Sequence, residues 1–166
     1  MKGIIVYKSV YGSSRQYADW LSEDTGFPAR DVVNVTQEEL REAEAVVMGC
    51  GVMAYRPTLA RWIDQNRDLL RDKKLFAFTT SGSDKDDPRL QEGFRTALRD
   101  LADQFTYVPV GGRLNATSLR PVHRLMLRLG IRIRRELAER ARSGDGVDNI
   151  NRSDLAPLLE AIREAS

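Results

Sequence analysis

A short stretch near the start of the chain combines hydroxyl side chains with a glycine. The stretch S-V-Y-G-S-S contains Ser9, Tyr11, Gly12, Ser13 and Ser14 and directly follows the apolar run G-I-I-V-Y. Hydroxyl groups donate hydrogen bonds to phosphate oxygens, glycine lets the backbone approach an anion, and the N–H groups that open a helix attract negative charge. The pattern therefore predicts a phosphate socket. A turn that caps a helix and binds nothing is the alternative.

Two further stretches of small, hydroxyl or aromatic residues also follow apolar runs. Their members are Gly51, Val52, Met53, Ala54 and Tyr55 in one stretch and Thr80, Ser81 and Gly82 in the other. The ring of Tyr55 can stack on a flat ligand, and packing on the next helix is the alternative. Acidic residues within 84–87 would disfavour negative charge on such a ligand and lower its reduction potential.

Several common nucleotide and catalytic motifs are missing from the sequence. It has neither a GxxxxGK(S/T) loop nor a GxGxxG turn after the first apolar run. Phospho-receiver domains need acidic residues after the first and third strands, where this chain has Lys8-Ser9 and Gly49-Cys50. A single histidine, His123, excludes a histidine-based triad. We therefore predict no metal site and no catalytic side chain, so that a bound cofactor would supply the chemistry.

Strand-like and helix-like segments alternate along the chain and would position these loops. Apolar, β-branched runs predict strands over 2–8, 29–35, 44–51, 73–82 and 105–112. Helical spacing predicts helices over 14–24, 59–70 and 89–104, a short helix opened by a Thr36–Glu39 capping box, and a last helix that Ser153 or Asp154 caps and that runs to Ile162. This alternation predicts an α/β fold with a doubly wound parallel sheet. Ligands of such sheets bind beyond the carboxyl ends of the strands, where all three stretches fall.

The composition suits one domain over residues 1–166, with an insertion at about 113–150. Hydrophobic residues make up 42% of the chain and charged residues 30%, and the net charge is +2. Residues 113–142 hold nine Arg and two Glu, whereas the rest of the chain has 17 basic and 22 acidic residues. The first apolar run is too short for a signal peptide or membrane span, so we expect a cytoplasmic protein.

The basic insertion has a face that could meet a negatively charged partner. On a helical wheel Arg124, Arg128 and Arg132 share one side, and Leu127 and Ile131 lie beside them. Exposed apolar residues next to a row of arginines favour contact with an anionic membrane surface or a carboxylated substrate. A helix that only covers the sheet edge is the alternative. Nucleic acid ranks last because no aromatic residues are interleaved with the arginines.

Together these features resemble the flavodoxin family, whose phosphate loop reads T/S-x-T-G-x-T. Ser9, Gly12 and Ser14 match that loop, and Tyr11 replaces a threonine. The closest resemblance is to the menaquinone-dependent protoporphyrinogen oxidases, carried by V-V-M-G-C-G-V-M-A-Y-R-P-T-L-A-R-W-I, by G-G-R-L and by the insertion R-P-V-H-R-L-M-L-R-L-G-I-R-I-R-R-E. The resemblance implies a five-stranded sheet of order 2-1-3-4-5, FMN as cofactor, and a quinone or a redox protein as partner.

Three functions stay open on the sequence alone. The first is an FMN-dependent oxidoreductase, with quinone-linked oxidation of protoporphyrinogen as its implied reaction and peripheral contact with the inner face of the membrane. The second is a soluble flavodoxin-type electron carrier. The third is a binding module of the same fold that has lost its flavin. The replacement of the family's threonine by Tyr11 in the phosphate loop allows this function.

Overall fold

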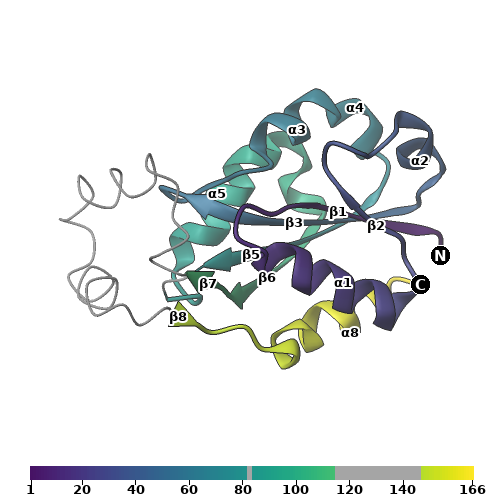
Figure 1. Ribbon diagram of the computed structural model, residues 1–166. Helices are drawn as coiled ribbons and strands as arrows, with labels where there is room; N and C mark the ends of the chain where they lie inside the picture. Colours follow the sequence, from purple (N-terminus) through teal and green to yellow (C-terminus); the bar gives the residue numbers. More distant parts are fainter. Residues whose placement is uncertain (82–83, 115–146) are drawn as a thin grey trace.

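Five parallel strands form the centre of the structure, with helices on both faces (Figure 1). The computed structural model describes residues 1–81, 84–114 and 147–166. Its strands are β1 (Gly3–Lys8), β2 (Ala29–Asp31), β3 (Ala45–Met53), β4 (Arg56–Pro57), β5 (Lys74–Ser81), β6 (Phe105–Gly111), β7 (Arg113–Leu114) and β8 (Val147–Asp148). Its helices are α1 (Ser13–Thr25), α2 (Gln37–Glu42), α3 (Ala60–Gln65), α4 (Arg67–Leu70), α5 (Pro88–Leu98) and α8 (Ala156–Glu164), with 3₁₀ turns η1 (Arg99–Gln104) and η2 (Arg152–Leu155).

The order of the strands confirms the predicted topology. The sheet runs β2-β1-β3-β5-β6, and all four neighbouring pairs are parallel. Counted along the chain without the short β4, this is the order 2-1-3-4-5. Strand β4 is an addition that pairs antiparallel with the end of β3. The doubly wound fold therefore places the carboxyl ends of β1, β3 and β5 side by side.

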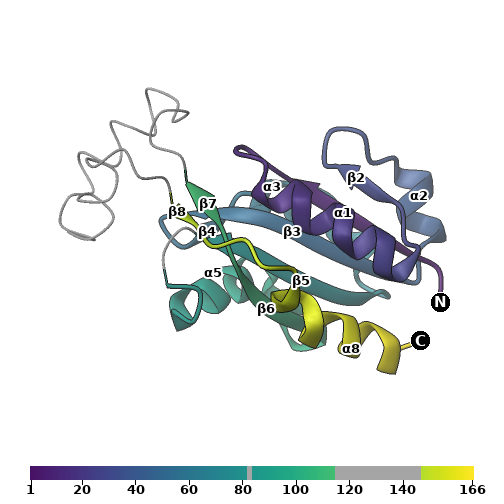
Figure 2. The same cartoon turned by 60° about the horizontal axis from the view of Figure 1, so that its bottom comes forward.

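Alternating side chains of the strands build two apolar cores, one on each face of the sheet. Ile4 and Val6 of β1 join the core under α2, α3, α4 and α5, whereas Ile5 joins the core under α1 and α8. Figure 2 shows α1 and α8 together on one face of the sheet. Strands buried on both faces read as continuous apolar runs, which is why β1, β3 and β5 were visible in the sequence.

The second strand is shorter than its apolar run predicts. The run 29–35 was expected to be one strand, but β2 ends at Asp31 and a turn follows. The Asp31 carboxylate accepts a hydrogen bond from the Val33 N–H at 3.1 Å, which closes a turn of the kind that Asp favours. Val33 is consequently 82% exposed. A polar side chain therefore overrides the β preference of the valines.

Three helix boundaries also differ from the predicted ones. The helix expected over 59–70 divides into α3 and α4 at Asn66, whose amide donates to the Trp62 carbonyl. The helix expected over 89–104 ends at Leu98 and continues as a 3₁₀ turn. Asn151 caps the turn before α8 by accepting from the Ser153 N–H, so neither Ser153 nor Asp154 is the cap. The Thr36–Glu39 capping box of α2 is confirmed.

The ends of the insertion meet at the carboxyl edge of the sheet. Strands β7 and β8 pair antiparallel, with Arg113 opposite Asp148, and the two side chains form an ion pair at 2.9 Å. The residues 115–146 between them lie outside the described part of the chain. Within the described ranges, no helix is long and apolar enough to cross a membrane.

Candidate functional site

The pairing of the strands brings the three predicted stretches to one edge. Lys8 at the end of β1 pairs with Cys50, and Gly51 pairs with Thr80 at the end of β5. The loop after β1 and the hairpin after β3 therefore begin at the same level of the sheet as the end of β5. Of the predicted residues at this edge, Gly82 lies outside the described residues.

Gly12 starts helix α1 in a conformation that leaves space beside the backbone. Its φ is +89°, in the left-handed region that favours glycine. A Cβ added to Gly12 would meet no heavy atom of the described residues within 4 Å. The Gly12 N–H donates to the Ser9 hydroxyl oxygen at 3.1 Å, and α1 has no side-chain cap among the described residues. The loop thus presents a helix start without a side-chain cap, next to space that no other described residue fills.

The hydroxyls of Ser13 and Ser14 connect this helix start to the rest of the edge. Both residues are buried. The Ser13 oxygen accepts from the Arg113 N–H at 2.9 Å, and the Ser14 hydroxyl lies 3.0 Å from that of Thr80. The Ser13 hydroxyl in turn donates to the Arg113 carbonyl oxygen at 3.5 Å, so it is both donor and acceptor. The Ser14–Thr80 contact therefore joins the first predicted stretch directly to the third.

The second predicted stretch is a tight hairpin rather than an open loop. Met53 pairs with Arg56, and Ala54 and Tyr55 between them have φ of 48° and 64°. Two positive φ values are typical of the type I′ hairpin turn, whose usual sequence is Asn-Gly or Asp-Gly. Because Ala-Tyr lacks that signal, sequence reasoning could not find the hairpin. Non-glycine residues in this region are strained, and such strain concentrates at functional sites.

Helix α5 supports the hairpin from one side. A Cβ added to Gly93 would lie 1.7 Å from the Tyr55 carbonyl oxygen, so the absence of a side chain at Gly93 permits the contact. The Arg89 guanidinium lies over the Tyr55 ring, 4.3 Å from its centre. Sequence reasoning missed Gly93 and Arg89, because a contact between a hairpin and a helix more than 30 residues later leaves no local pattern.

Arg89 also neutralises one of the acidic residues that follow β5. Its guanidinium binds the buried Asp87 carboxylate at 2.7 and 2.9 Å, and the same carboxylate caps α5 by accepting from the Arg89 N–H. Asp87 therefore brings less net negative charge to this edge than the sequence indicates, and its predicted lowering of a ligand's reduction potential is weakened.

Among the described residues, no cluster of His, Cys, Asp or Glu could hold a metal ion.

Asp154 ties four segments of this edge together. Its carboxylate accepts from Lys85 at 2.7 Å and from the Gly111 N–H at 3.0 Å, and it also interacts with the Tyr17 hydroxyl. Partial burial acts to raise the pKa of Asp154, but these hydrogen bonds together hold it below its usual value. Burial raises the pKa of Tyr17 to about 12, despite the hydrogen bond from the Asn151 N–H. Asp154 is therefore ionised at neutral pH.

Cys50 is the only cysteine of the chain and is not a reactive thiol at this edge. Burial raises its pKa to about 11, against smaller opposing effects of hydrogen bonds from the Leu59 N–H and from Thr58. A thiol that stays protonated is a poor nucleophile. The Cys50 side chain is instead a buried member of the apolar core.

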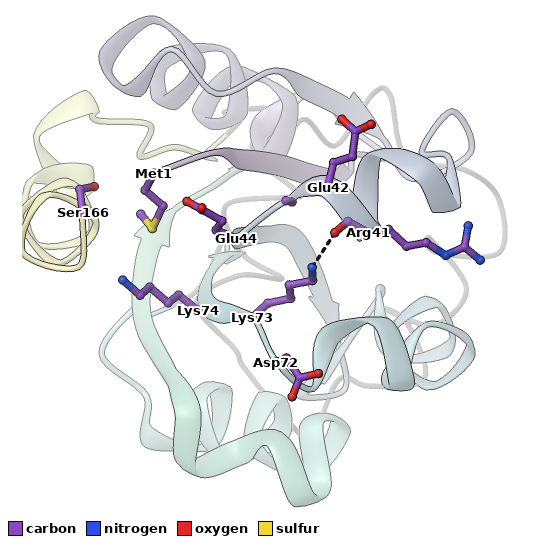
Figure 3. Close-up of a pocket in the computed structure, with 9 residues that line it drawn as sticks. Met1, Arg41, Glu42, Glu44, Asp72, Lys73, Lys74 and Ser166 are labelled. Carbon is purple, nitrogen blue, oxygen red and sulfur yellow. Dashed lines mark hydrogen bonds between the residues drawn. The ribbon is translucent and has the colours of Figure 1, made fainter.

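A hollow of about 470 Å³ lies at the opposite, amino edge of the sheet (Figure 3). It is lined by charged side chains, including Glu44, Lys73 and Lys74. Several of these already bind within the chain: Lys73 donates to the Arg41 carbonyl, Lys74 to the Ala165 carbonyl, and Glu44 accepts from the Lys2 N–H. Because the hollow lies at the amino edge and the candidate site at the carboxyl edge, the two are separate.

The sequence of the chain matches the flavodoxin domain over residues 4–139. The chain belongs to the flavodoxin family. Comparison with curated proteins finds no match. The family match does not point to the protoporphyrinogen oxidase branch.

Solved flavodoxin-like structures share this fold. A WrbA-like flavodoxin from Agrobacterium tumefaciens is 19% identical, with a TM-score of 0.54 over 86% of this chain and 98% of its own. The two-electron reduced flavodoxin of Megasphaera elsdenii is 13% identical, with a TM-score of 0.53 over 66% and 83%. A flavoprotein from Lactobacillus acidophilus in complex with FMN is 14% identical, with a TM-score of 0.50 over 67% and 92%.

The described part of this flavodoxin-family chain brings most of the predicted cofactor residues to one edge. Their contacts with a ligand stay predictions. The predicted membrane or substrate residues, Arg124, Leu127, Arg128, Ile131 and Arg132, lie outside the described residues.

Proposed function

We propose that this chain binds FMN at the carboxyl edge of its sheet and transfers electrons through it. The observation that carries the proposal is the start of α1. Among the described residues, nothing fills the space beside the left-handed Gly12, and the helix has no side-chain cap. An anion is the complement of such a helix start. The flavodoxin family assignment and an FMN complex among the structures of the same fold agree with this choice of ligand.

The residues of the edge fit the parts of FMN. Backbone N–H groups of the first turn of α1, together with the hydroxyls of Ser9 and Ser13, would hold the phosphate. The ring of Tyr55 would form a wall for the flavin, and the backbone at Gly51 and Thr80 would border its polar edge. When bound, FMN supplies reversible uptake of electrons, and the protein supplies its orientation and its electrostatic surroundings.

An absorbance spectrum and an FMN titration test this proposal. The purified protein should show the bands of oxidised flavin, and the protein freed of flavin should quench FMN fluorescence with one site per chain. A folded protein that takes up no FMN would favour the third function, a binding module without flavin.

The finer proposal is that the protein oxidises protoporphyrinogen and passes the electrons to a membrane quinone. Its support is the resemblance of G-V-M-A-Y and of the basic segment to the corresponding oxidases, and the nine arginines within residues 113–142. Each arginine near an anionic lipid surface contributes about 1 kcal/mol of attraction, so the segment would hold the protein at the membrane. Such peripheral contact would bring a membrane quinone to the flavin edge. A soluble electron carrier that meets a redox protein at the same edge is the competing function.

Vesicle binding separates these two functions. The protein should bind vesicles that contain anionic lipid and should dissociate as salt is added. Replacing Arg124, Arg128 and Arg132 by Gln should abolish binding and menaquinone-linked oxidation while FMN stays bound. A control with the same loss of charge replaces the exposed Arg41, Arg61 and Arg163 by Gln. If the wild type ignores the vesicles and reduces no quinone, the carrier function is favoured.

A further inference from the structure

We propose that Arg89 is a positioning residue of the flavin site: it backs the ring of Tyr55 and balances the charge of Asp87 beside it. The inference rests on the proposed FMN site and deepens it. Its basis is the stack of the Arg89 guanidinium on the Tyr55 ring together with the two-point ion pair with Asp87.

The stack and the ion pair use different parts of the same guanidinium. The Nε and Nη2 atoms lie 2.9 and 2.7 Å from the two Asp87 oxygens, while the guanidinium carbon lies 4.3 Å from the centre of the Tyr55 ring. A planar guanidinium can bind a carboxylate at two points through its edge and stack on an aromatic ring through its face, whereas an ammonium group has neither the flat face nor the two-point edge. Arginine is therefore the residue type that suits this position.

The carboxylate that anchors this arrangement is buried and hydrogen-bonded. The Asp87 side chain is only 6% exposed, and its carboxylate also caps helix α5. Gly93, one turn further along α5, contacts the Tyr55 carbonyl. The strained hairpin turn is thus held to α5 at its backbone by Gly93 and at its ring by Arg89.

Arg89 covers one face of the Tyr55 ring, so the opposite face is the one on which a flavin would stack. A ring held from behind loses less freedom when the ligand binds, which favours affinity. The positive charge one ring away from the flavin also compensates the Asp87 carboxylate. Without it, the negative charge of Asp87 would oppose the uptake of electrons by the flavin.

Four variants test the affinity and the potential separately. Arg89→Lys keeps the charge and loses the stack, so FMN should bind about two- to fivefold more weakly at a nearly unchanged midpoint potential. Arg89→Gln should bind at least as weakly and shift the midpoint potential to more negative values. Asp87→Asn keeps a helix-capping side chain and should shift the potential to more positive values. Arg95→Gln is the matched control, because Arg95 of the same helix lies over the ring of Phe105.

A test without flavin examines the positioning of Tyr55 alone. Chymotrypsin should cleave the flavin-free Arg89→Gln and Arg89→Lys variants after Tyr55 faster than the wild type, while Arg95→Gln is cleaved at the wild-type rate. Structural damage alone would not move the potentials of the Arg89→Gln and Asp87→Asn variants in opposite directions.

Three outcomes would overturn the proposal. Tighter FMN binding by both Arg89 variants would mean that Arg89 occupies the flavin's place and must leave. Unchanged affinity, potential and cleavage would mean that the stack has no role. A wild type that binds no FMN would overturn the proposed function together with this inference, whereas wild-type binding with unaffected variants would overturn the inference alone.

Discussion

Gly12 and Gly26 stand at the two ends of helix α1 and allow a matched test of the phosphate socket. Both have positive φ, +89° and +74°, and at neither would an added Cβ meet a heavy atom of the described residues within 4 Å. Alanine at either position therefore introduces the same kind of backbone strain without a clash. The two positions differ in location, because Gly12 lies at the candidate site and Gly26 at the far end of the helix.

The expected loss of stability is similar for Gly12→Ala and Gly26→Ala. An alanine held at positive φ costs about 1–2 kcal/mol. For a chain of this length each kcal/mol lowers the melting temperature by about 2–4 °C. Thermal unfolding of the flavin-free proteins should therefore show a decrease of about 2–8 °C for each variant.

FMN affinity should separate the two variants. The methyl group that Gly12→Ala adds would occupy the space that the phosphate needs, and crowding of a filled site costs about 1–3 kcal/mol, or about five- to 150-fold in Kd. Gly26→Ala should bind FMN with the wild-type Kd in a fluorescence titration below its melting temperature. Equal affinities of the two variants, whether reduced or unchanged, would refute a phosphate socket at Gly12.

Three further predictions follow from contacts at the same edge. The Cys50 thiol, with a pKa of about 11, should be about one-thousandth ionised at pH 8. A thiol reagent should therefore label the native protein far more slowly than the unfolded protein. Immediate stoichiometric labelling of the native protein would contradict the raised pKa. The pKa of Asp154 is lower in the folded than in the unfolded protein, so its contribution to the free energy of unfolding is complete above about pH 5 and is lost as the pH falls through the folded pKa. Urea titrations should therefore show that Asp154→Asn is more destabilising at pH 5 than at pH 3. An equal effect at the two pH values would contradict the lowered pKa. Ser14→Ala should lower the free energy of unfolding by about 1–3 kcal/mol, because it leaves the buried Thr80 hydroxyl unpaired. The double variant with Thr80→Val should lose less than the sum of the two single losses. Strict additivity would show that the two hydroxyls are not coupled.

The sequence by itself determined the sheet and the place of the candidate site. Strands buried on both faces must be continuous apolar runs, and the helices between them carry their own periodicity, so both signals are local. The same holds for Gly12, because a glycine between a strand and a helix start is readable without knowledge of its neighbours. The capping box of Thr36 and Glu39 likewise lies within four residues and was found correctly.

The tertiary structure alone decided how the walls of the site are built. The hairpin at Ala54 and Tyr55 has no turn signal of its own and is held by residues of α5. Asp154 looks like a helix cap in the sequence, yet its carboxylate binds Lys85 and the Gly111 N–H. Such contacts join residues more than 30 positions apart, and they exist only after the sheet has brought its strand ends together. Local residue patterns carry no record of them.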